Sequence, residues 1–249
     1  MLGAFFDDSG TDEGSPICVI GGLLGTEDQW KAFAYKWAGC LANSVPGKPR
    51  LKQFHLIDCI NHNGEFVGYN HAETDLIQRL FRDVIVRSDI VTIAVGVDKV
   101  AWNELVTCDL ADELGEPIEL CFVQCMERVI RNARFYRPGE PVSVFFDQGT
   151  KEKLQNWSYL YESQKAFYPE LDVVRFAPVK VVFPLQAAVT IATASFHYNK
   201  EWLKNGVHAI PNPHFQDFMK RRYSEGFMIG REHIAEVVAR VREKIASRV

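Results

Sequence analysis

The chain has 249 residues, of which 47% are apolar and 24% are charged, and its formal net charge is −4. This composition is typical of a globular protein with a buried core, and it argues against disorder. No run of 18 apolar residues occurs and the start, MLGAFFDDSG, lacks basic residues, so we expect neither a transmembrane helix nor a signal peptide. The negative charge gives the whole molecule no attraction to a polyanion, although local patches or bound cations can reverse the field.

Six cysteines occur without a CxxC pair, and a chain of this length needs no disulfides for stability. Cys121 and Cys125 are four residues apart, as neighbours on a helix face would be. We therefore expect free, mostly buried thiols and a reducing, cytoplasmic location.

Two strands are predicted at the start of the chain. Residues 2–6 form an apolar strand that ends at Asp7, and a segment rich in turn formers follows. Residues 17–24 form the second strand. The two are expected to pair as an antiparallel hairpin with a long loop.

A helical segment is expected next. The spacing from Thr26 to Gln29 is that of a capping box and begins a helix, and an apolar stripe predicts another helix over residues 72–87. The third strand covers residues 89–97. Residues 27–88 are thus predicted to form a helical insertion between the second and third strands.

The middle of the chain predicts a short helix over residues 99–106 and a long helix over residues 117–134, with proline in its first turn. A fourth strand over residues 142–146 is almost wholly apolar and is therefore expected at the centre of the sheet. It ends at Asp147, and a helix over residues 151–166 follows.

The last part predicts a short fifth strand over residues 173–176 and a long, largely apolar helix over residues 185–204. An amphipathic helix over residues 231–248 ends the chain. We expect one α/β domain over residues 1–249, with residues 205–249 as a C-terminal helical extension.

Without the insertion, the predicted order is three strands followed by helix, strand, helix, strand and helix, which is the order of the ribonuclease H fold. In that mixed sheet the first and fourth strands are parallel neighbours at the centre. Because neighbouring strands lie about 5 Å apart, we expect Asp7 and Asp147 at the two strand ends to share one site.

Four segments, FFDDSGT, FHLIDC, SVFFD and FPLQAAVTIA, resemble the uncharacterised bacterial proteins grouped as domain of unknown function 3800. The resemblance spans about residues 2–200, and the opening and the glutamine helix are its most specific parts. It implies a ribonuclease H-like fold with an acidic centre like that of a nuclease, and it singles out His55 and Gln186. Where the family helix has an aspartate three residues after the glutamine, this chain has Val189.

Phosphodiester hydrolysis at such a centre needs Mg²⁺ or Mn²⁺ held by oxygen ligands. We expect Asp7 and Asp147 as primary ligands and Asp8 as an auxiliary one, although Asp7 and Asp8 point to opposite faces if both lie in the strand. Gln186 would position substrate or water, and His55 would orient a phosphate or shuttle a proton. The structural alternatives are an Asx turn at Asp7 and a turn or helix cap at Asp147.

The spacing of His55, Asp58 and His62 is compatible with a transition-metal site, but an isolated pattern of this kind is weak evidence. A partly buried loop histidine is an equally good interpretation of His55. Two short basic runs are usually explained as solvated loops. They are Lys48, Arg50 and Lys52, and Lys220, Arg221 and Arg222. The first run lies in the insertion and would contact a phosphate backbone if the insertion folds over the sheet edge.

Three functions stay open. The leading hypothesis is a metal-dependent phosphodiesterase or nuclease. The second is a degenerate module that keeps the fold and binds a protein or nucleic-acid partner, which the loss of an acid at Val189 favours. The third is an unrelated α/β hydrolase or transferase with its site elsewhere, which a deep pocket far from Asp7 and Asp147 would favour.

Overall fold

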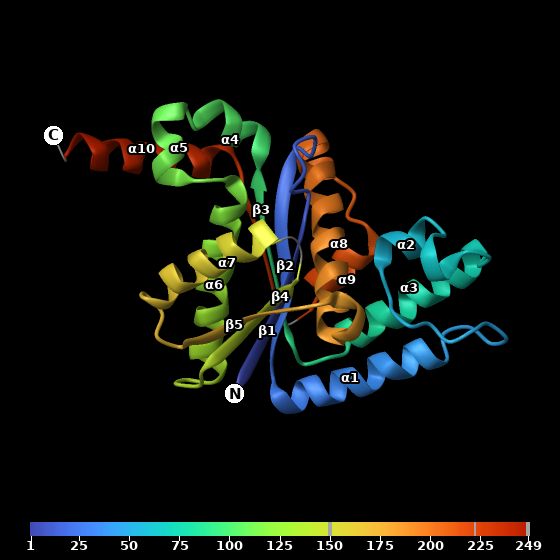
Figure 1. The fold of residues 1–249 in the computed structure, drawn as a ribbon. Coiled ribbons are helices and arrows are strands. Elements are labelled where there is room, and N and C mark those ends of the chain that lie inside the picture. The colour runs from blue at the N-terminus through green and yellow to red at the C-terminus, as the bar shows by residue number, and fades with distance from the viewer. Residues whose placement is uncertain (149–150, 222, 248–249) are drawn as a thin grey trace.

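A mixed β-sheet organises the chain. The computed structural model describes residues 1–148, 151–221 and 223–247, and in residues 151–154 it describes the backbone. The described strands form one six-stranded sheet in the order β5-β4-β1-β2-β3-β6, with helices on both faces (Figure 1). The strands are β1 (Leu2–Ser9), β2 (Ile17–Thr26), β3 (Val91–Asp98), β4 (Val142–Asp147), β5 (Leu171–Ala177) and β6 (Ser224–Ile229).

The pairing at the centre of the sheet places the predicted first and fourth strands side by side. β1 pairs antiparallel with β2 and parallel with β4, and the β1–β4 register runs from Leu2 opposite Val142 to Phe6 opposite Phe146. β2 and β3 are antiparallel, and β4 and β5 are parallel. The prediction that β1 and β4 are parallel neighbours is therefore confirmed.

β6 corrects two predictions, the five-stranded sheet and the purely helical extension over residues 205–249. It pairs parallel with β3, from Ser224 opposite Thr92 to Ile229 opposite Val97. Its sequence, SEGFMI, begins with serine, glutamate and glycine, and most of its side chains are only partly buried at the sheet edge. Strand formation here depends on pairing with β3 rather than on a local apolar pattern.

The predicted helices are confirmed within a few residues, and short ones that were not predicted are added. The helices are α1 (Glu27–Ala42), α2 (Leu56–Ile60), α3 (His71–Val86), α4 (Lys99–Leu105), α5 (Cys108–Leu114), α6 (Pro117–Tyr136), α7 (Lys151–Lys165), α8 (Phe183–Asn205), α9 (Pro213–Met219) and α10 (Arg231–Ala246). The 3₁₀ turns of the described residues are η1 (Gly64–Phe66), η2 (Val179–Val181) and η3 (Gly206–His208).

The helices divide between the two faces of the sheet (Figure 1). We call one the α6 face; its core combines strand residues with α4, α5, α6, α7 and α10. We call the other the α8 face; its core combines strand residues with α1, α3, α8 and α9. Alternation along each strand therefore decides which helices a side chain meets.

The predicted insertion over residues 27–88 is part of the core of the α8 face. The capping box that was predicted at the start of α1 is present, because Gln29 N–H donates to Thr26 Oγ1 at 3.3 Å and Thr26 N–H donates to Gln29 Oε1 at 2.7 Å. Trp37 of α1 packs on Phe81 of α3, and Phe81 stacks on Phe54 with ring centroids 4.2 Å apart. These aromatic contacts fix the segment that carries His55 against α1 and α3.

All six cysteines are free, and Cys18, Cys59, Cys121 and Cys125 are buried. The expectation of free, mostly buried thiols is thus confirmed. None of the described helices combines the length and the apolar composition that crossing a membrane requires.

Candidate functional site

Asp7 and Asp147 lie on the α8 face at the carboxyl ends of neighbouring parallel strands. Two residues before them, Phe5 and Phe145 stack with ring centroids 4.5 Å apart and an angle of 9° between their planes. Because side chains alternate along a strand, the two aspartates follow these rings on the same face. Gly21 of β2 lies opposite Asp7. A Cβ atom added at Gly21 would lie 2.5 Å from Ala192 N of α8, so the helix packs closely on the strand here.

Asp8 lies on the other face. β1 continues through Ser9, so Asp7 and Asp8 are both strand residues. The partner of Asp8 is Ile20, which belongs to the core of the α6 face, and Asp8 Oδ2 accepts a hydrogen bond from Thr11 Oγ1 at 3.2 Å. The expected role of auxiliary ligand requires Asp8 on the same face as Asp7 and Asp147. The structure places Asp8 on the opposite face.

Asp147 is half-buried, and one of its carboxylate oxygens contacts the turn after β5. Val179 N–H of η2 donates to Asp147 Oδ1 at 3.2 Å. Asp147 lies opposite Ala177 of β5, which packs against the core of the α8 face. This hydrogen bond directs the side chain toward η2, on the α8 face of the sheet.

Gln186 is completely buried and holds three segments together. Its Oε1 accepts hydrogen bonds from Trp37 Nε1 at 2.9 Å and from Phe54 N at 3.0 Å. Its Nε2 lies 3.3 Å from the carbonyl oxygen of Val179 and 3.2 Å from that of Lys180. Because both ends of the amide are occupied by protein and none of it is exposed, the contacts give Gln186 a structural role rather than the predicted contact with substrate.

Val189 lies on α8 between the two places where the helix meets this site. One turn before it, Gln186 contacts Val179, the residue that bonds to Asp147. One turn after it, Ala192 lies against Gly21, the partner of Asp7. Val189 is 6% exposed. An acid at this position would face the same region, whereas valine adds only apolar surface.

His55 lies next to Phe54 and is therefore attached to α8 through Gln186. It is the N-cap of α2, where its Nδ1 accepts from Asp58 N–H at 3.4 Å, and the same Nδ1 lies 3.1 Å from Asp58 Oδ2. A nitrogen cannot accept one bond and donate the other at once, so the cap belongs to the neutral ring and the ion pair to the protonated ring. The side chain is 38% exposed, which leaves it accessible to a ligand.

The sequence pattern His55, Asp58 and His62 does not assemble into one cluster. His55 contacts Asp58, whereas the ring nitrogens of His62 contact the carbonyl oxygen of Tyr69 and the ring of His71. Within the described residues no group of three or more histidine, cysteine, aspartate or glutamate side chains could hold a metal ion.

The described side chains of α7 provide no replacement for the acid that the sequence resemblance leads us to expect at position 189. This helix packs on the α6 face through Trp157 and Tyr161, and Glu162 is exposed there. The side chain of Glu152 lies outside the described part of the chain.

The basic residues differ in their availability. Lys48 pairs with Glu73 at 3.2 Å and donates to Gly68 O at 2.8 Å, whereas Arg50 and Lys52 are exposed. Arg221 donates to the carbonyl oxygens of Ser88 and Ile90, and burial lowers the pKa of its guanidinium to about 10. Arg222 lies outside the described residues. Arg50 and Lys52, near His55, are the better candidates for contact with an anion.

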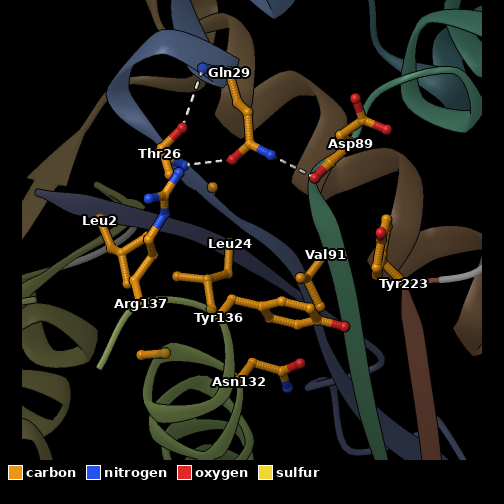
Figure 2. A pocket seen from close by; sticks show the side chains of 12 residues that line it. Leu2, Leu24, Thr26, Gln29, Asp89, Val91, Asn132, Tyr136, Arg137 and Tyr223 are labelled. Atoms are coloured by element: carbon orange, nitrogen blue, oxygen red, sulfur yellow. Dashed lines mark hydrogen bonds between the residues drawn. The ribbon is translucent and has the colours of Figure 1, made fainter. Parts of the chain in front are cut away.

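A cavity of about 210 Å³ lies at the opposite end of the sheet, beside the start of β1 and the end of β2 (Figure 2). Two of its polar side chains make structural contacts: Gln29 Nε2 donates to Asp89 O at 2.6 Å, and Asn132 Nδ2 donates to Glu225 Oε1 at 2.9 Å. These two contacts have a structural role at this end of the sheet.

No protein-family model matches the chain, and no curated protein is significantly similar to it. The resemblance in the four sequence segments therefore stays a hypothesis, and a function has to be inferred from the residues themselves.

Proposed function

We propose that the chain is a metal-dependent phosphodiesterase or nuclease in which Asp7 and Asp147 hold Mg²⁺ or Mn²⁺. The observation that carries the proposal is the position of the two aspartates, at the carboxyl ends of adjacent parallel strands and on the same face of the sheet. Carboxylate oxygens are the ligands that these cations prefer. When bound, such an ion activates water and stabilises the leaving oxygen of a phosphodiester.

The accompanying fold proposal is a ribonuclease H-like arrangement. It is supported by the antiparallel β1, β2 and β3 and by β4 and β5, which continue the sheet in parallel beside β1. β6 at the far edge is an addition to that scheme.

The neighbouring residues have distinct roles in the proposal. His55 would orient a phosphate oxygen or carry a proton, since it is partly exposed and its segment is attached to α8 beside the Asp147 contact. Arg50 and Lys52 would meet the phosphates of a nucleic-acid strand that extends past His55. Gln186 would act indirectly, by fixing α8, Phe54 and η2 relative to one another.

A second candidate is a degenerate module that binds a nucleic-acid or protein partner without cleavage. The buried Val189 favours it, because the residue adds no ligand where the resemblance leads us to expect an acid. Two carboxylates alone form a weaker metal site than the three or four that usually share the charge.

Mn²⁺ binding distinguishes these functions. We would titrate Mn²⁺ into the folded wild type and into Asp7→Asn, Asp147→Asn and Asp8→Asn by calorimetry. We expect saturable binding that each of the first two substitutions weakens at least about tenfold. Asp8→Asn is the matched control, since it makes the same change one residue away on the opposite face, and it should bind as the wild type does.

Two further results complete the test. Val189→Asp should strengthen Mn²⁺ binding, because it adds a carboxylate between Gln186 and Ala192, where α8 meets the site. Single-stranded DNA, duplex DNA and RNA should then be tested for cleavage. A folded wild type that binds no Mn²⁺ at millimolar concentration would overturn the enzyme proposal and favour the degenerate module.

A further inference from the structure

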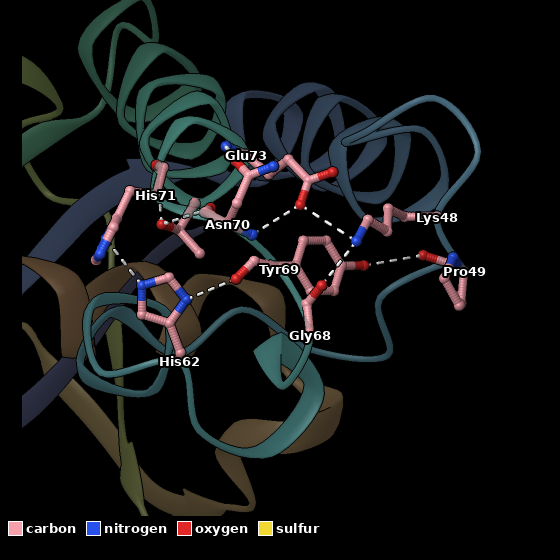
Figure 3. Close-up of polar contacts among 9 residues, drawn as sticks. Lys48, Pro49, His62, Gly68, Tyr69, Asn70, His71 and Glu73 are labelled. Carbon is pink, nitrogen blue, oxygen red and sulfur yellow. Dashed lines mark hydrogen bonds and ion pairs between the residues drawn. The ribbon is translucent and has the colours of Figure 1, made fainter.

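Two histidine rings contact each other on the surface of the segment between α2 and α3 (Figure 3). His62 Nε2 lies 3.0 Å from His71 Nδ1, and the ring centroids are 4.6 Å apart with an angle of 86° between the planes. The other nitrogen of His62, Nδ1, lies 2.9 Å from the carbonyl oxygen of Tyr69. Neither residue belongs to the site of Asp7 and Asp147.

The carbonyl oxygen of Tyr69 determines the tautomer of His62. A carbonyl oxygen only accepts, so His62 Nδ1 carries the proton and His62 Nε2 keeps its lone pair. His71 Nδ1 then donates to that lone pair in the neutral pair. The lone pair of His62 Nε2 is thus directed toward the other imidazole.

The backbone conformation at each histidine is fixed by features other than the contact between the two rings. His62 has φ of 55°, and it is the only described non-glycine residue with a positive φ, a conformation that usually needs a compensating interaction. His71 is the first residue of α3, whose start is fixed by the reciprocal hydrogen bonds of Asn70 and Glu73. Tyr69 between them is buried, with Lys48 4.7 Å from the centre of its ring.

This arrangement is that of a metal-ligating histidine. Such a ring typically donates its second N–H to a backbone carbonyl, which fixes its orientation. Zinc lies about 2.0–2.1 Å from each ligand nitrogen, so two nitrogens of a tetrahedral site are about 3.3 Å apart. The nitrogens of His62 and His71 are 3.0 Å apart. A small separation of the rings, together with a rotation that turns both lone pairs from the N–N line toward a common point, reaches that geometry. His71 needs only to move its ring proton from Nδ1 to Nε2.

We propose that His62 Nε2 and His71 Nδ1 form a binding site for a divalent transition metal, Zn²⁺ in the first instance. Water completes the coordination, because within the described residues no third histidine, cysteine or acid joins a cluster. Imidazole suits zinc, copper and nickel better than Mg²⁺, so this site differs in metal preference from the carboxylates of Asp7 and Asp147. Bound metal would link the turn after α2 to the first turn of α3.

The experiment is a calorimetric titration of the full chain with Zn²⁺ alone. We expect saturable binding that His62→Asn and His71→Gln each weaken about tenfold or more; asparagine is chosen because it tolerates the left-handed backbone at residue 62. The titration is repeated in the Asp7→Asn/Asp147→Asn background, which removes these carboxylates as competing Zn²⁺ ligands. The histidine-dependent binding should remain there, which separates it from the proposed nuclease site. The matched controls are His208→Gln, an exposed histidine elsewhere, and His55→Gln, which tests the pattern seen in the sequence.

A second measurement uses the wild type alone and does not depend on the folding of a variant. Zn²⁺ should shift the ¹⁵N resonances of His62 Nε2 and His71 Nδ1 together, at one stoichiometric point. The proposal is overturned if the folded wild type binds no Zn²⁺ at millimolar concentration, if His62→Asn/His71→Gln binds it as tightly as the wild type, or if only other histidines shift.

Discussion

The two faces of the sheet differ in the polar groups that they bury. The α6 face buries aliphatic and aromatic side chains together with the thiols of Cys121 and Cys125, and the buried polar residues of α6, Arg128 and Asn132, bond near its edge. The α8 face buries the amide of Gln186 among its aromatic rings and satisfies it completely. Buried polar groups cost free energy unless they are hydrogen-bonded. On the face that contains Asp7 and Asp147, the hydrogen bonds of a fully buried amide therefore join α8, α1, the Phe54 segment and η2.

Replacing Gln186 should have the largest effect. Gln186→Leu leaves the N–H groups of Trp37 and Phe54 and the carbonyl oxygens of Val179 and Lys180 without their partner. The two N–H groups are buried, whereas the two carbonyl oxygens are only partly buried. At about 2 kcal/mol for each buried N–H group, the free energy of unfolding should fall by roughly 4 kcal/mol. Urea denaturation measures this loss.

The matched control for Gln186 is Met126→Leu in the core of the α6 face, where Met126 is completely buried. A volume-conserving change of this kind should cost less than about 1.5 kcal/mol. Equal losses on the two faces would show that the hydrogen bonds of Gln186 do not distinguish them.

The second effect is a pH dependence from His214 on α9, whose Nε2 lies 3.2 Å from Gln78 Oε1. Burial and then Arg82 lower its pKa from 6.5 to about 4, although Asp217 acts in the opposite direction. The unfolded chain therefore takes up a proton below pH 6.5 that the folded chain resists. Stability present above pH 6.5 is lost as pH falls toward 4, by up to roughly 3 kcal/mol.

The measurement is the free energy of unfolding between pH 7 and pH 4 for the wild type and His214→Phe. The free energy of unfolding of the variant should change less with pH over this range, because phenylalanine does not titrate. If the free energies of unfolding of the two proteins fell equally with pH, the loss of stability would not come from His214.

Gly21→Ala should have the third-largest effect. The added Cβ would lie 2.5 Å from Ala192 N and 2.6 Å from Ala192 Cα, which are backbone atoms of α8. The helix would have to move away from β2, at a cost of about 2 kcal/mol, and the spacing between Asp7 and α8 would change with it. Thermal unfolding of the variant tests this.

Gly39→Ala is the control for Gly21, because nothing lies within 4 Å of its added Cβ in α1. Alanine is the better helix former, so this variant should gain about 0.5–1 kcal/mol. Effects of the same sign at both glycines would contradict the close approach of α8 to β2.

The sequence predicted elements whose signals are local. The capping box at Thr26 and the apolar strand before Asp147 each specify their structure within a few residues, and both were confirmed. β6 could not be found in this way, since SEGFMI carries no strand pattern and depends on pairing with β3. The short α9 was missed although its start carries local signals: Phe215 N–H donates to Asn212 Oδ1 at the N-cap, and Pro213 lies in the first turn.

In the candidate site, too, some features could be predicted from the sequence and others depend on contacts between distant segments. The positions of Asp7 and Asp147 at neighbouring strand ends follow from the order of the elements, and the structure gives both side chains the same face. The burial of Gln186 could not be predicted, because its partners Trp37 and Phe54 lie in the insertion. The contact of His62 with His71 was missed for a similar reason: it depends on a turn with a positive φ at His62 that no sequence signal specified.

The smallest expected effect is on the α6 face, at Cys125. Its thiol is completely buried and donates weakly to Ile20 O at 3.7 Å, and burial raises its pKa. If this face is held by apolar packing, Cys125→Ala should cost about 1 kcal/mol for the lost sulfur. Cys125→Ser should cost more although serine is closer in size, because a hydroxyl loses more on leaving water than a thiol does. Urea denaturation of both variants gives the order, and a serine variant more stable than the alanine variant would mean that the α6 face accepts polar atoms as readily as the α8 face does.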